Sequence, residues 1–83
     1  MAISLEDLDL AELTLALRER LAGSPPAGYL VGRTALRDAV TDELQCSELL
    51  AEEIVDTLVA RGFARYQGDP AAEIDDLRGW SLG

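Results

Sequence analysis

The stretch ELQCSELLAEEIVDTLVARGFARY, residues 43–66, decides the fold of this chain. Ser47 predicts the start of a helix, because its hydroxyl can accept a hydrogen bond from a free backbone N–H of the first turn. Apolar residues then recur with the 3.6-residue period of an amphipathic helix: Leu50, Ala51, Ile54, Val55, Leu58 and Val59. Gly62 suits the left-handed conformation that ends many helices. Residues 63–66, Phe-Ala-Arg-Tyr, favour a strand directly after it.

The order of these signals resembles the winged-helix superfamily, broadly of the MarR kind. The matching residues are Cys46, Ser47, Leu58, Gly62 and Phe63. Leu58 and Gly62 fall eleven and fifteen positions after the serine, as they do in the family. The resemblance covers about the last two-thirds of the chain. It implies an α+β winged helix-turn-helix, with three helices plus a small antiparallel sheet and a C-terminal β-hairpin wing.

The helix expected after Ser47 departs from the family in its charge. DNA-reading members carry basic or polar residues at its early exposed positions, where they face bases and phosphates. The equivalent positions here are Glu48, Leu49, Leu50, Glu52, Glu53 and Thr57. Acidic side chains repel a polyanion whose neutralisation supplies most of the binding energy. They form either a merely solvated face or a binding surface for a basic or apolar protein partner. The candidate partner-binding residues are Glu48, Leu49, Glu52, Glu53 and Asp56.

The bulk charge agrees with this local sign. The 83 residues predict a single domain, residues 1–83, with a formal net charge of −9. Residues 42–76 hold ten acids and two arginines, a local balance of −8. Such a field favours solubility and basic partners, and it opposes nucleic acid and anionic membranes.

The residues that most enzymes rely on are missing. The chain has no histidine and no lysine, so a Cys/His zinc site, a serine triad and a Schiff base are excluded. The single cysteine, Cys46, is expected to pack in the core. The acidic residues of the segment 69–78 lack the order of an EF-hand loop. We therefore expect no enzyme activity, no metal and no cofactor.

The N-terminal residues and the hydropathy of the chain indicate where in the cell the protein is expected. The start of the chain lacks a basic region followed by an apolar run, and no apolar run approaches membrane-spanning length. A cytoplasmic protein with no membrane partner is the expectation.

A first helix is predicted over residues 5–22, with Ser4 as its cap. Its apolar surface has two stripes: Leu10, Leu13, Leu17 and Leu21, and beside them Leu8, Ala11, Leu15 and Ala22. A helix with this much apolar arc buries two sides. Either the hairpin and the third helix cover both sides, or the second stripe forms a homodimer seam.

Residues 29–31, Tyr-Leu-Val between two glycines, predict a short first strand. Thr34 then predicts the cap of a helix over residues 35–44, with Leu36, Val40 and Leu44 facing inward.

Arg33 and Arg37 lie near the start of that helix. They are the main evidence for a DNA-binding function, but acidic residues follow closely, so local ion pairing is the favoured interpretation. The alternative DNA-binding set is Arg33, Arg37 and Arg65, with Arg78 as a further candidate.

The end of the chain predicts a hairpin. Residues 67–70 form a turn, and residues 79–82 form the returning strand, with Trp80 and Leu82 closing the core.

Two functions remain open on this sequence. The first is an acidic winged-helix module that regulates by binding a protein partner. The second is a DNA-binding transcriptional regulator that docks through its few arginines.

Overall fold

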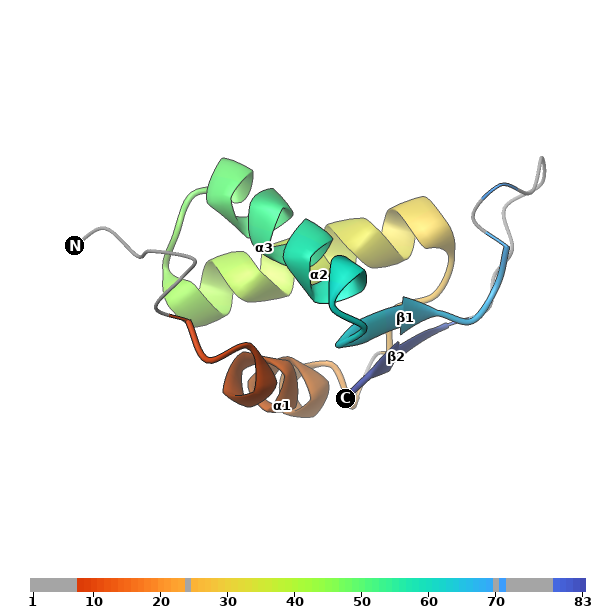
Figure 1. The fold of residues 1–83 in the computed structure, drawn as a ribbon, viewed down its shortest axis with the longest axis horizontal. Coiled ribbons are helices and arrows are strands. Elements are labelled where there is room, and N and C mark those ends of the chain that lie inside the picture. Colours follow the sequence, from red (N-terminus) through yellow and green to blue (C-terminus); the bar gives the residue numbers. More distant parts are fainter. Residues whose placement is uncertain (1–7, 24, 70, 72–78) are drawn as a thin grey trace.

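The computed structural model describes residues 8–23, 25–69, 71 and 79–83. Its elements follow in the order α1 (Leu10–Arg20), α2 (Tyr29–Leu44), α3 (Glu48–Ala60), β1 (Ala64–Tyr66) and β2 (Trp80–Leu82). The chain is therefore α+β, with three helices and a small antiparallel sheet in its described part (Figure 1). This arrangement is compatible with a winged-helix-like fold.

The predicted helix after Ser47 is confirmed. The Ser47 hydroxyl accepts a hydrogen bond from the Leu50 N–H at 3.2 Å, which caps α3. The inward positions of α3 are buried: Ala51, Ile54, Val55 and Leu58. Gly62 has a φ of 79°, so the chain leaves α3 through the left-handed conformation expected of this glycine. The strand β1 follows at once.

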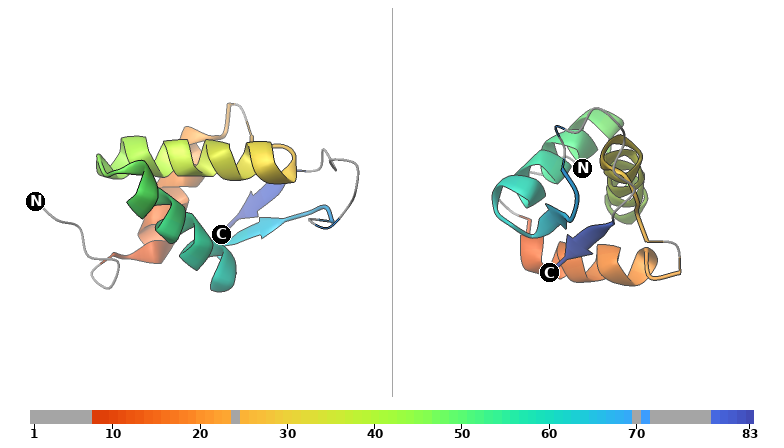
Figure 2. Two further views of the ribbon diagram at one scale, coloured as in Figure 1. Left: turned by 90° about the horizontal axis from the view of Figure 1, so that it is seen from above. Right: turned by 90° about the vertical axis from the view of Figure 1, so that its right-hand side faces the viewer.

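The turn between α2 and α3 spans residues 45–47. Gln45 takes a left-handed conformation with a φ of 52°, which ends α2. Cys46 packs against the core but is only half-buried. This short turn makes α2 and α3 a helix-turn-helix pair, and the two lie packed together in both views of Figure 2.

The strand predicted over residues 29–31 is wrong. Those residues open α2, whose N-cap is Gly28, and Thr34 lies inside the helix instead of capping it. What remains of a third strand is one bridge between Ala27 and Gly79. The inward face of α2 is as predicted, with Leu36 and Val40 fully buried and Leu44 partly buried.

An aromatic cluster of Tyr29, Tyr66 and Trp80 joins the start of α2 to the hairpin. Trp80 stacks on Tyr29 at 5.9 Å between ring centroids and lies 5.3 Å from Tyr66. Its indole N–H donates to the Gly28 carbonyl at 2.9 Å. The predicted return strand is thus confirmed, and Trp80, only 9% exposed, closes the core from β2.

The hairpin register places Tyr66 opposite Trp80 and Ala64 opposite Leu82. Most of the predicted acidic segment 69–78, including Arg78, lies outside the described residues.

The first helix is shorter than the predicted range of residues 5–22. Leu8 and Asp9 are not helical, and the Asp9 carboxylate caps α1 by accepting from the Glu12 N–H at 3.1 Å. Ser4, the predicted cap, lies outside the described residues. An aspartate one residue before the apolar stripe can therefore cap the helix where the stripe itself begins.

The two apolar stripes of α1 have different surroundings. Leu10, Leu13 and Leu17 are buried against the rest of the core. In the second stripe Ala11, Leu15 and Ala22 are exposed, and Leu15 keeps 57% of its surface. The expectation that the hairpin and third helix cover both sides is therefore wrong for these residues, because α1 packs on α2 and β2 with one side only.

Candidate functional site

The outer side of α3 carries the acidic residues of the predicted partner-binding set. The helix sequence contains four carboxylates and no basic residue. All five members of the set are exposed: Glu48, Leu49, Glu52, Glu53 and Asp56. They are exposed because the opposite side of the same helix supplies the core residues of α3.

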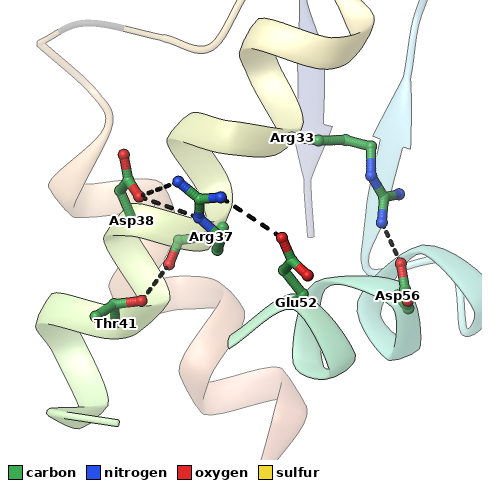
Figure 3. Close-up of polar contacts among 6 residues, drawn as sticks. All are labelled: Arg33, Arg37, Asp38, Thr41, Glu52 and Asp56. Atoms are coloured by element: carbon green, nitrogen blue, oxygen red, sulfur yellow. Dashed lines mark hydrogen bonds and ion pairs between the residues drawn. The ribbon is translucent and has the colours of Figure 1, made fainter. Parts of the chain in front are cut away.

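Two of these acids are bound by arginines of α2 (Figure 3). The Arg33 guanidinium pairs with the Asp56 carboxylate, and the Arg37 guanidinium lies 3.5 Å from the Glu52 carboxylate. The arginines are four residues apart on α2, as the acids are on α3, so equivalent positions on successive turns face each other. We call these two interhelical pairs the ion ladder.

Arg37 has a second partner on its own helix. Its Nε and Nη2 donate to the Asp38 carboxylate at 3.2 Å and 3.0 Å. The hydrogen bond with Asp38, together with the nearby charge of Glu48 and the contact with Glu52, raises the pKa of Arg37 above its already high usual value. The guanidinium therefore stays charged, and its charge is engaged by carboxylates of its own chain.

The ion ladder divides the predicted partner-binding set. Glu52 and Asp56 are directed toward α2, and their charges are partly compensated there. No ion pair within the described residues includes Glu48 or Glu53, although the charge of Glu48 acts on Arg37. Leu49 is 71% exposed between these acids. An apolar side chain bordered by carboxylates is a surface suited to a partner with an apolar contact and basic neighbours.

The alternative set of arginines is not gathered on one surface. Arg33 and Arg37 face α3, and each has a quarter of its side chain exposed. Arg65 lies in β1, where its Nε donates to the Gly62 carbonyl at 3.2 Å. The expected local ion pairing is present for Arg37, whose nearer acceptor is Asp38. The acceptors from α3, Asp56 for Arg33 and Glu52 for Arg37, are ones that the sequence pattern did not indicate.

A groove of about 370 Å³ lies where the ion ladder crosses from α2 to α3. Leu30 and Thr34 line its α2 side, and Val55 lies on its α3 side. Leu30 is 72% exposed. Its exposure was not predicted, because residues 29–31 were expected to form a strand. Exposed Leu30 gives α2 an apolar surface residue comparable with Leu49 of α3.

Comparisons of the chain with protein-family models, curated proteins and solved structures gave no match. Within the described residues, none of the helices combines the length and apolar character needed to span a membrane.

Proposed function

We propose that this protein is a non-enzymatic, winged-helix interaction module that binds a protein partner through the exposed side of α3. The observation that carries the proposal is the charge of that surface. It presents Glu48 and Glu53 on either side of exposed Leu49, and α3 contributes no cation. A partner with a basic rim and an apolar centre fits it.

The ion ladder supports the proposal because it engages the arginines that DNA binding would need. A helix-turn-helix that binds DNA needs cations free to neutralise phosphates. Arg33 and Arg37 are engaged by Asp56, Glu52 and Asp38 of the same chain. Phosphate contacts through these arginines would have to displace carboxylates that are already in place. The winged-helix scaffold thus serves, in this proposal, a regulatory role by protein binding in the cytoplasm.

The charge part of the proposal is tested with two doubly substituted variants of equal net charge. Tagged wild-type protein, Glu48→Gln/Glu53→Gln and Glu12→Gln/Glu19→Gln are used to retain partners from an extract of the source cells. The partner should be lost from the α3 variant and kept by the α1 variant, whose glutamates are also exposed. Equal loss from both variants would trace the effect to net charge and contradict a site on α3.

The DNA-binding alternative is decided by a salt titration. Fluorescence anisotropy of labelled duplex DNA is measured with the wild-type protein between low and physiological salt. We expect no saturable binding at physiological salt. Clear binding that weakens steeply as salt rises, and that falls further in Arg33→Gln/Arg37→Gln, would establish the alternative.

The exposed second apolar stripe of α1 suits a further partner, which is a second copy of this chain. Leu15 is 57% exposed, with Ala11 on the same side of the helix. A homodimer through α1 would cover this side and leave α3 accessible. Sedimentation velocity at high micromolar concentration separates a dimer from a monomer, and Leu15→Glu should abolish any dimer that forms through α1.

A further inference from the structure

Arg37 of the ion ladder has two acidic partners, one on each helix. Its guanidinium lies 3.0 Å from the Asp38 carboxylate of α2 and 3.5 Å from the Glu52 carboxylate of α3. Figure 3 shows Arg37 between these two acids. Because the nearer acceptor belongs to its own helix, Arg37 keeps an ion pair when Glu52 is taken away.

Arg33 of the ion ladder has an aromatic second partner. It pairs with Asp56 across the helices, and its guanidinium carbon also lies 5.9 Å from the centroid of the Tyr29 ring. A cation at this distance over an aromatic ring is attracted by the π electrons. Arg33 therefore also keeps a favourable contact on α2 when its acid from α3 is taken away.

The carboxylates are the more exposed members of both ladder pairs. The side chains of Asp56 and Glu52 are 68% and 58% exposed, whereas those of Arg33 and Arg37 are each 25% exposed. A binding protein can thus reach both carboxylates from outside. An ion pair with so exposed a member contributes little stability, since water and salt weaken it, and it is therefore easily exchanged.

We propose that the ion ladder is an autoinhibitory contact that a basic protein partner opens. This inference rests on the proposed binding surface of α3. While the ladder is closed, the charges of Glu52 and Asp56 are partly compensated, and Glu48 and Glu53 supply most of the field that the partner meets. When cations of the partner take Glu52 and Asp56, the arginines keep their contacts on α2. All four carboxylates of α3 then face the partner.

The double contacts of the arginines also select a cation over a phosphate as the group that opens the ladder. A cation that replaces an arginine leaves the carboxylate paired and the arginine with its partner on α2. A phosphate that takes Arg37 instead leaves Asp38 and Glu52 without their cation and beside a like charge.

The inference is tested with a labelled helical peptide that carries a leucine between lysines, the chemistry of the proposed partner. Arg33→Gln/Arg37→Gln removes the ladder. Arg18→Gln/Arg20→Gln is the matched control, because it removes equal charge and breaks a different interhelical pair, that of Arg20 with Glu43. In fluorescence anisotropy at physiological salt, the ladder variant should bind the peptide about five- to tenfold more tightly than the wild type. The control should gain less than about twofold.

Nuclear magnetic resonance follows the opening of the ladder in the wild-type protein. The side-chain carboxyl carbon resonances of Glu52 and Asp56 should shift when the peptide is added, because each carboxylate exchanges its cation. The Nε–H resonance of Arg37 should move little, because this N–H donates to Asp38 and not to Glu52. Circular dichroism establishes that each variant is folded.

The outcomes separate a failure of the ladder from a failure of the proposed site. A ladder variant that binds no more tightly than the control would overturn the inference alone. So would carboxyl resonances of Glu52 and Asp56 that stay in place while those of Glu48 and Glu53 shift, because the peptide would then bind α3 with the ladder closed. A peptide affinity that Glu48→Gln/Glu53→Gln leaves unchanged would place the peptide elsewhere and overturn the proposed site together with the inference.

Discussion

Replacing Gly32 by alanine is expected to destabilise the fold by about 1–3 kcal/mol, the cost of overpacking a core. Inside a helix the same substitution ordinarily stabilises by about 1 kcal/mol. The sign reverses because a Cβ at Gly32 would overlap the Nε1 and Cδ1 atoms of Trp80. The indole would have to move, and it would lose its hydrogen bond to the Gly28 carbonyl and its stacking on Tyr29. Urea denaturation followed by circular dichroism measures the change in unfolding free energy.

Gly23→Ala is the matched control. A Cβ at Gly23 meets no other atom within 4 Å, and its φ is not positive. We expect this variant to be as stable as the wild type or slightly more stable, because alanine restricts the unfolded chain. A double-mutant cycle with Trp80→Phe completes the test, since a smaller ring should reduce the penalty at Gly32. A Gly32→Ala variant at least as stable as the wild type would show that Trp80 does not require this glycine.

The same contact explains which part of the fold the sequence could not predict. Residues 29–31 have strand-forming side chains between two glycines, and local propensity alone favours a strand there. The structure places them in α2, where Tyr29 stacks on Trp80 and Gly32 gives the indole room. The Trp80 to Gly28 hydrogen bond joins residues 52 positions apart, which no local pattern reveals. Pro26 also has no N–H to donate to a neighbouring strand, so the pairing with β2 stops at one bridge.

The candidate site could be predicted in its composition but not in its pairing. The period of the apolar residues in α3 determines which side is exposed, so the exposed carboxylates followed from the sequence. Which of them face α2 depends on how the two helices cross. Glu52 and Asp56 meet Arg37 and Arg33 only in the packed structure. Charge spacing within one helix identifies candidate partners on that helix, such as Arg37 and Asp38, and does not identify partners across a helix pair.

Leu49→Ala is expected to lower the affinity for the proposed protein partner by at least tenfold while leaving the fold intact. Leu49 is 71% exposed at the start of α3, so its truncation removes little packing, and the unfolding free energy should change by less than about 0.5 kcal/mol. A large apolar side chain at the centre of an interface, in contrast, commonly contributes about 2 kcal/mol or more to binding. Titration calorimetry with the partner retained in the extract experiment gives the affinity, and urea denaturation gives the stability.

Leu30→Ala is the control for that substitution. It makes the same chemical change at an equally exposed leucine, 72% exposed, on the α2 side of the molecule. Its affinity for the partner should equal that of the wild type if binding centres on Leu49 with Glu48 and Glu53. Equal weakening by both substitutions would move the interface to the groove that the ion ladder crosses, which Leu30 lines. Weakening by Leu30→Ala alone would remove the outer side of α3 from the proposal, because the carboxylates there would then surround a leucine that the partner does not contact.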